Sequence, residues 1–170
     1  MPKHDTDIIV QVSPEALKTA ALGVISGLRS MAGPALLARA AARGDVGGLE
    51  GTRFAALGSD VAATAFQILM VGEMGVDKTP FVPSRVSAGP LFGRALSGAL
   101  VGSALFASGG RRGITGALLG GASAIGGVYA ADRLRSASTQ NLGLPDPVYG
   151  LIEDGVVLLG GSRLLRAVSP

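Results

Sequence analysis

The stretch from residue 113 to residue 131 restricts the fold of this chain more than any other feature. Its 19 residues include no charged side chain, and about 18 apolar residues in a row are enough for a helix to cross a bilayer. A helix that is apolar on every side is stable only where lipid or protein surrounds it. The stretch therefore predicts a membrane-spanning helix.

Four other apolar segments extend this prediction to a bundle of about five spans. The expected spans are residues 16–42, 54–74, 91–108, 113–131 and 148–167. Gly33 and Pro34 should kink the first span, because proline removes a backbone donor inside a helix. Pro80 and Pro83 predict an extended loop between spans two and three. The expected fold is an all-α polytopic membrane bundle, a single domain over residues 13–170 that follows a polar tail at residues 1–12.

The composition suits helices that pack closely in lipid. Charged residues make up 16% of the chain and hydrophobic residues 48%, whereas roughly a quarter of the residues in soluble domains are charged. The chain contains 27 glycines. Three pairs of them within the expected spans have the G-x-x-x-G spacing, which places two small residues on one helix face. They are Gly23 and Gly27, Gly98 and Gly102, and Gly116 and Gly120. We expect helix contacts at all six. A soluble helical protein is the alternative, but glycine costs roughly 1 kcal/mol in a water-exposed helix.

Several classes of function are disfavoured by the residues present. The formal charge is +3, but the basic residues are scattered singly or in pairs and no aromatic residues alternate with them, so nucleic acid is not an expected partner. The only histidine is His4, in the polar tail, and there is no cysteine. Catalytic triads and metal sites built from these residues are therefore not expected. We predict no enzymatic activity, no cofactor and no metal.

Charged residues inside the expected spans need a specific reason, because a charge at mid-helix costs roughly 2.5–3.5 kcal/mol on insertion scales. Arg29 lies near the middle of the first span. We expect it either in a buried ion pair or in an anion contact or gate. Glu73 and Asp77 are four residues apart, on one side of a continuous helix. With Lys78 they could form a self-neutralised helix end, or they could coordinate a cation or relay a proton.

The fifth span contains two adjacent acids, Glu153 and Asp154. Their side chains point about 100° apart on a helix, so at least one should face the interior of the bundle. They are expected either to pair with Arg29 or Arg94, or to take part in transport. The candidate polar pathway or ion-pair cluster consists of Arg29, Glu73, Asp77, Lys78, Arg94, Glu153 and Asp154.

The distribution of basic residues gives five spans no preferred orientation. One side would contain Lys3, Lys18, Lys78, Arg85, Arg94, Arg133 and Arg135, and the other Arg39, Arg43, Arg53, Arg111, Arg112, Arg163 and Arg166. The cytoplasmic side of a membrane protein normally carries an excess of Lys and Arg. Seven basic residues on each side therefore do not indicate which side is cytoplasmic. Either the number of spans differs from five, or the chain inserts in both orientations and forms an antiparallel homodimer.

A family resemblance rests on four motifs taken in order. They are Gly27-Leu28-Arg29-Ser30 with Pro34; Glu73 with Asp77-Lys78-Thr79-Pro80 and Pro83-Ser84-Arg85; Gly93-Arg94-Ala95-Leu96-Ser97-Gly98-Ala99; and Leu144-Pro145-Asp146 with Leu151-Ile152-Glu153-Asp154. The sequence thereby resembles the bacterial membrane-protein family called domain of unknown function 4126, over nearly the whole chain after residue 15. The resemblance implies a multi-spanning membrane protein and implies no activity.

These patterns predict an integral protein of the cell (inner) membrane. The favoured function is a small transporter or channel-like protein for an ion or small solute, with the candidate cluster along its path. The expected partners are the lipid bilayer, that ion or solute, and further copies of the chain in a homo-oligomer. The alternative is a structural or scaffold membrane protein that assembles through glycine-faced helices and holds its charges in internal ion pairs.

Overall fold

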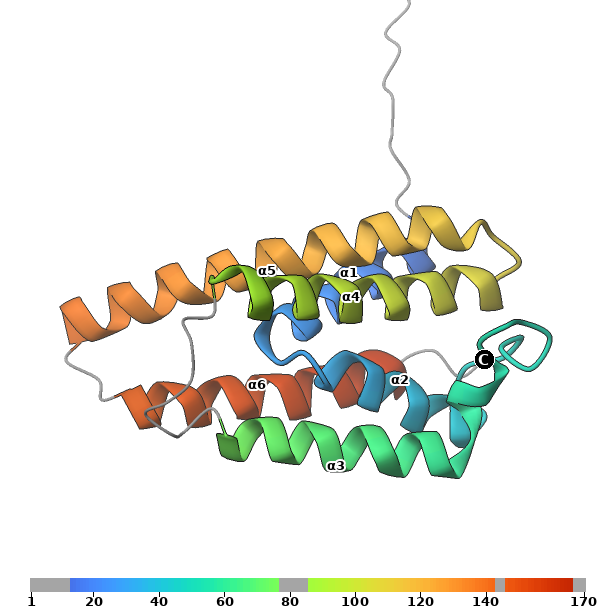
Figure 1. Cartoon of the computed structure of the whole chain (residues 1–170), viewed down its shortest axis with the longest axis horizontal. Coiled ribbons are helices and arrows are strands. Elements are labelled where there is room, and N and C mark those ends of the chain that lie inside the picture. Colours follow the sequence, from blue (N-terminus) through green and yellow to red (C-terminus); the bar gives the residue numbers. More distant parts are fainter. Residues whose placement is uncertain (1–12, 77–85, 143–145, 167–170) are drawn as a thin grey trace, which may run out of the picture.

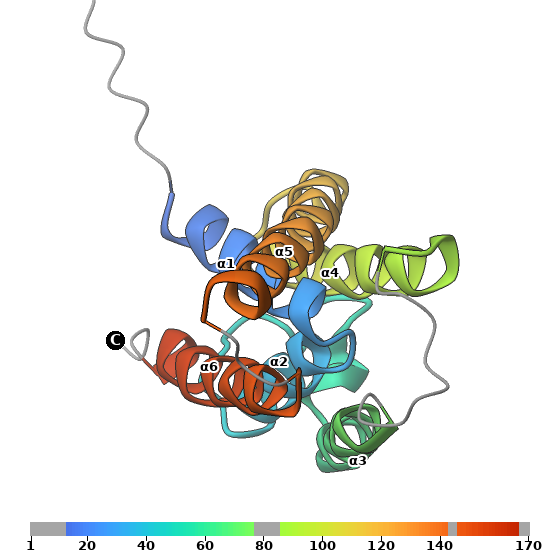
Figure 2. The ribbon, with the colours of Figure 1, turned by 90° about the vertical axis from the view of Figure 1, so that its left-hand side faces the viewer.

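A computed structural model of the chain describes residues 13–76, 86–142 and 146–166. All regular secondary structure in these ranges is helical, which confirms the predicted all-α class. The elements are α1 (Pro14–Leu28), α2 (Ala32–Ala42), the 3₁₀ helix η1 (Ala55–Gly58), α3 (Asp60–Val76), α4 (Ala88–Ser108), α5 (Gly113–Leu142) and α6 (Asp146–Arg166). Figures 1 and 2 show two layers, with α1, α4 and α5 in one and α2, α3 and α6 in the other.

The segment expected to form the first span is a helical hairpin. The chain turns back between α1 and α2, so that α2 returns towards the end of the molecule at which α1 begins (Figure 1). The two helices contain 15 and 11 residues, which correspond to about 22 Å and 16 Å at 1.5 Å per residue. Because α2 reverses the direction of α1, the two helices do not add up to one crossing of a hydrocarbon core of about 30 Å. The prediction of one kinked span over residues 16–42 is therefore wrong.

The break lies at residues 29–31, before the predicted kink. Arg29 has extended backbone angles (φ −139°, ψ 115°), which end α1. Pro34 falls in the first turn of α2, where the N–H that proline lacks would have no partner inside the helix. Proline therefore helps to begin a helix here. Gly33 lies against the Ser26 hydroxyl of α1, and a side chain at this position would keep the two helices apart.

Three other boundaries differ from the sequence-based expectation. α3 begins at Asp60, because residues 55–58 form η1. α5 continues to Leu142, well past the expected end at residue 131. The polar residues 132–142 include no proline or glycine, so nothing in the backbone ends the helix there. The expected Pro-rich loop falls largely at residues 77–85, which lie outside the described residues.

Two of the described helices are long and apolar enough to cross a membrane. They are Ala88–Ser108, with 21 residues, and Gly113–Thr139, with 27 residues. Both helices qualify by length and composition alone, and a core helix of a soluble protein can have the same length and composition. The other three expected spans do not qualify in the described part of the chain.

The predicted glycine pairs lie where α5 crosses α4 and α1. Gly102 faces Gly116, and Gly98 faces Gly120, in both cases so closely that a Cβ on either glycine would meet the carbonyl oxygen of the other. On the second side of α5, a Cβ on Gly23 would lie 2.6 Å from the Gly120 carbonyl oxygen. Gly27 approaches the backbone of α5 at Ala124 and Val128 in the same way. We call α1, α4 and α5 the glycine-packed layer.

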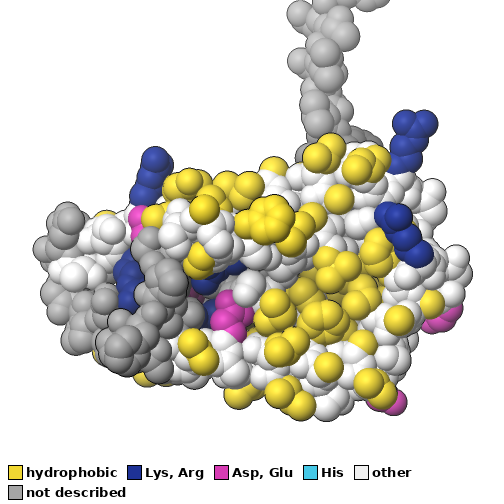
Figure 3. Space-filling model, in the orientation of Figure 1, with side chains coloured by type: hydrophobic (Ala, Val, Ile, Leu, Met, Phe, Trp, Pro, Cys, Tyr) yellow, Lys and Arg dark blue, Asp and Glu magenta, His cyan; other side chains and the backbone are white. Residues whose placement is uncertain are grey.

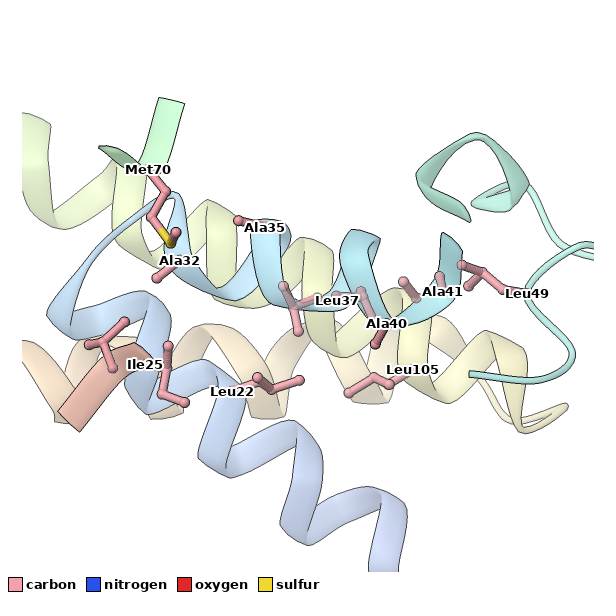
Figure 4. Packing of buried hydrophobic residues seen from close by; sticks show 13 residues of the cluster. Leu22, Ile25, Ala32, Ala35, Leu37, Ala40, Ala41, Leu49, Met70 and Leu105 are labelled. Carbon is pink, nitrogen blue, oxygen red and sulfur yellow. The ribbon is translucent and has the colours of Figure 1, made fainter. Parts of the chain in front are cut away.

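Figure 4 shows how the second layer rests on the first. Leu22 and Ile25 from α1 meet Ala32 and Leu37 from α2 at a buried apolar contact. Most of α2 is small and buried, so this helix lies in the middle of the molecule between α3 and the glycine-packed layer. The apolar core thus surrounds the hairpin, and the hairpin tip is placed deep in the structure.

Adding one methyl group to α5 should test the glycine contacts. In Gly120→Ala, the new Cβ would lie 2.9 Å from the Gly98 carbonyl carbon, and overpacking of this kind costs about 1–3 kcal/mol. The control is Gly126→Ala, whose Cβ would meet nothing within 4 Å and which gains helix propensity of up to about 1 kcal/mol. Thermal unfolding in detergent micelles should rank Gly120→Ala below wild type and Gly126→Ala at or above it. Equal stability of the two variants would contradict the described contacts.

Candidate functional site

Buried charges gather around the tip of the α1–α2 hairpin, where the two layers meet. Four helices contribute to this site in addition to residues 29–31: α3, α4 and α6 supply charged side chains, and α2 supplies its N-terminus. Figure 3 shows acidic and basic side chains together in the space between α3 and α4, while hydrophobic side chains cover much of the rest of that face. The charges are therefore concentrated at one depth of an otherwise apolar molecule.

Arg29 is the largest fully buried side chain among the described residues, at 1% exposure. Its Nε donates a hydrogen bond of 2.9 Å to Oδ1 of Asp154, and Nη2 lies 2.9 Å from the same oxygen and 3.7 Å from Oε2 of Glu153. The sequence left open whether the acids of α6 pair with Arg29 or Arg94, and the structure places both against Arg29. This contact joins α6 to the junction of α1 and α2.

Glu73 binds the backbone at the start of α2. Its Oε1 accepts hydrogen bonds of 2.8 Å from the backbone N–H and the hydroxyl of Ser30, and its Oε2 accepts one of 2.8 Å from the N–H of Met31. These N–H groups have no carbonyl partner one turn earlier because the chain is extended at Arg29. A carboxylate is favourable here, since the N-terminal end of a helix carries partial positive charge. Glu73 therefore caps α2 from a helix that follows it in the chain.

Arg94 and Ser97 of α4 complete the site on the side of the glycine-packed layer. Nη2 of Arg94 lies 3.9 Å from Oε1 of Glu73, and the Arg94 side chain is 5% exposed. One turn further along α4, the Ser97 hydroxyl donates a hydrogen bond to the Ser30 carbonyl oxygen. The turn at Ser30 is thus bonded to both layers, through Glu73 on one side and Ser97 on the other.

Sequence reasoning found the charged members of the site but not the groups that hold them together. Ser30 and Ser97 occur in the family motifs, yet no pattern identified them as partners of the charges. Asp77 and Lys78 lie outside the described residues, so a cation site formed with Glu73 stays a prediction. Among the described residues, no group of three or more His, Cys, Asp or Glu side chains could hold a metal ion.

Chemically, the site combines a helix N-terminus, two guanidinium groups and three carboxylates in a largely buried region. Glu73 is the least buried of the five charged side chains, at 14% exposure, while the Glu153 side chain is 4% exposed. A proton or small ion that reached the site would meet Glu73 before the more deeply buried Glu153. The arrangement is also suited to a purely structural role, because its carboxylates contact cationic or N–H groups.

Removing the buried cation should be far more costly than removing a surface cation in a similar pair. Arg29→Leu leaves the carboxylates of α6 without their guanidinium, and breaking a buried pair in this way costs about 3–5 kcal/mol. Arg43→Leu is the matched control, because Arg43 contacts Asp45 at 3.0 Å with 42% of its side chain exposed. Such surface pairs contribute about 0–1 kcal/mol. Unfolding in micelles should separate the two variants, and comparable losses would show that Arg29 is not buried with its partners.

Comparisons with known proteins identify the family of the chain. Residues 16–165 match the family described as "Domain of unknown function (DUF4126)". No curated protein and no solved structure matches the sequence significantly. The matched range begins in α1, ends in α6 and includes every charged residue of the site. The chain therefore belongs to the DUF4126 family, as its motifs suggested.

Proposed function

We propose that the protein is an integral membrane protein that conducts or transports an ion or small solute past the tip of the α1–α2 hairpin. In this proposal α3, α4, α5 and α6 cross the bilayer, and α1 and α2 enter and leave it from the same side. The main support for this proposal is the helix break inside the apolar core, where the backbone N–H groups of Ser30 and Met31 donate to the Glu73 carboxylate.

The hairpin supports this proposal because backbone is broken at membrane depth only where protein buries it or where it lines a cavity. Many transporters bind their substrates at the ends of such half-helices. Here α1 ends and α2 begins beside side chains of both charges. No chemical step is part of the proposed function, and we expect no enzymatic role.

The outer surface supports a lipid environment. Large apolar side chains are exposed along the outward faces of the helices that would cross the bilayer. They include Ile68 (66%), Phe92 (65%), Leu118 (70%), Leu151 (61%) and Leu159 (62%). In water, apolar surface distributed over four helices would favour aggregation. Acyl chains cover such a surface without cost, which accounts for the exposed leucines beside buried arginines.

A scaffold function is the second candidate, and the close pairing at Arg29 favours it. A guanidinium 2.9 Å from a carboxylate in a closely packed interior is an arrangement that can hold helices in register without transporting anything. In this case the glycine-packed layer would provide rigidity, and the exposed apolar faces would contact another copy of the chain or a membrane partner. The two functions differ in whether water reaches the site.

Neutralising Glu73 should test transport. Glu73→Gln keeps an acceptor oxygen for the hairpin N–H groups but removes the charge, so flux should be lost while the helical fold is retained. The control is Glu50→Gln, at an exposed position outside the helices, which should leave flux unchanged. We would reconstitute each protein in liposomes and follow proton, K⁺ and Cl⁻ movement with trapped dyes. Wild-type flux in Glu73→Gln would exclude the proposed path.

Water access should separate the two candidates. The chain has no cysteine, so Ser30→Cys and Ser97→Cys each place a single thiol, close in size to the native hydroxyl, within the site. A water-soluble, membrane-impermeant thiol reagent should label both in proteoliposomes if the site is hydrated. Leu151→Cys, on the exposed apolar face, should resist the reagent because it contacts lipid. Protection at both serine positions in a folded protein would favour the scaffold, and fast labelling at position 151 would contradict a lipid-facing α6.

A further inference from the structure

The exposed arginines lie mostly at one end of the two-layered molecule. The helix directions in Figure 1 bring together the end of α2, the start of α3, the turn between α4 and α5, and the end of α6. We call this the arginine-rich end, and it is defined by Arg39, Arg43, Arg53, Arg111, Arg112 and Arg163, all of them exposed. At the opposite end the described basic residues are Arg133 and Arg135, near the end of α5.

We propose that the arginine-rich end is the surface that contacts the anionic headgroups of the cytoplasmic leaflet. The start of α1 and the end of α6 then lie on the cytoplasmic side, together with the open end of the α1–α2 hairpin. This inference rests on the membrane location in the proposed function but not on transport, so it holds equally for a scaffold.

The hairpin changes the balance of seven basic residues on each side that was expected for five spans. A hairpin that enters and leaves the membrane on one side keeps the basic residues before and after it on that side. A segment that crosses the membrane places them on opposite sides. Lys18, near the start of α1, and Arg166, the last residue of α6, belong to the arginine-rich end as well. Among the described residues the count is eight basic residues against two, with Arg29 and Arg94 in the interior. The positive-inside rule counts basic residues near the ends of the spans and assigns the end with eight to the cytoplasm.

Contacts at this end are those expected for a headgroup interface. The guanidinium carbon of Arg53 lies 5.0 Å from the ring centre of Phe54, and that of Arg111 lies 4.8 Å from the ring centre of Phe106. Each arginine therefore covers an aromatic ring close to the end of the molecule, and amphipathic groups of this kind gather at the interfaces of membrane proteins. Two of the arginines also contact acids, since Arg43 pairs with Asp45 and Arg111 with Glu15. Acidic residues contribute little to the rule, which does not depend on net charge.

The same orientation places the polar site nearer the outside. Glu73 is three residues from the last residue of α3, and Asp154 is eight residues from the first residue of α6. At 1.5 Å per residue these separations are about 5 Å and 12 Å from the helix ends opposite the arginines. A solute outside the cell would therefore reach Glu73 over a shorter distance than a cytoplasmic solute.

Two exposed alanines provide a matched test in the full-length chain. Ala56→Cys lies in η1 at the arginine-rich end, and Ala137→Cys lies near the far end of α5. A membrane-impermeant maleimide applied to intact cells should label Ala137→Cys, and it should label Ala56→Cys only after lysis. Any other pattern in a membrane-embedded protein overturns the orientation. Recovery of the protein in the soluble fraction without detergent would instead overturn the membrane location itself, so the two failures are distinguishable.

Moving the positive charge tests the headgroup contact directly. A variant with Arg53→Gln and Arg112→Gln loses two arginines at one end, and Ser136→Lys with Thr139→Lys adds two lysines at exposed positions of the other. In this background Ala56→Cys should become labelled in intact cells in a substantial part of the population. A labelling pattern identical to that of the single-cysteine parents would overturn the role of the arginines in orienting the protein.

Discussion

The contact between Arg29 and Asp154 is the interaction on which the arrangement of the layers depends. A guanidinium that is 1% exposed can be accommodated in an apolar interior only if carboxylates accompany it. The acids that do so come from α6, a helix separated from Arg29 by more than a hundred residues. The pair contributes little net stability relative to apolar residues of the same size. The pair instead determines where α6 packs, because in any other position of α6 the buried Arg29 and the acids of α6 would have no partner of opposite charge.

Glu73 has a different and complementary effect, since it makes a break in the chain tolerable. Extending the backbone at Arg29 exposes N–H groups that would each cost about 1–3 kcal/mol if buried without an acceptor. The two carboxylate oxygens accept from Ser30 and Met31, and the chain can reverse without that penalty. The reversal then determines the rest of the layout: α1 joins the glycine-packed layer, α2 joins the other, and the charges lie between them. Removing the acceptor oxygens of Glu73, rather than its charge alone, would therefore disturb the fold as well as any pathway.

The sequence predicted those features that depend on local pattern and missed those that depend on distant partners. The glycine pairs follow from spacing alone, and the buried charges were identifiable because they interrupt apolar stretches. The hairpin was not predictable, because the break at Arg29 requires Glu73, which follows Ser30 by 43 residues. Pro34 is ambiguous for the same reason: a proline kinks an established helix but fits the first turn of a new one, and no local pattern shows that a helix begins again at Ala32.

The two layer contacts also differ in how readily they could move. Within the glycine-packed layer, backbone meets backbone, so a displacement of α5 along α4 would drive Gly98 and Gly120 into each other. Elsewhere α1 makes its contacts through side chains, and two of its buried hydroxyls, Thr19 and Ser26, have no hydrogen-bond partner among the described residues. Thr19 lies beside Gly102 of the glycine-packed layer, and Ser26 lies beside Gly33 of α2. Buried hydroxyls without partners are uncommon in stable interiors. The close packing of both layers against α1 therefore leaves this helix with polar groups that its neighbours do not satisfy.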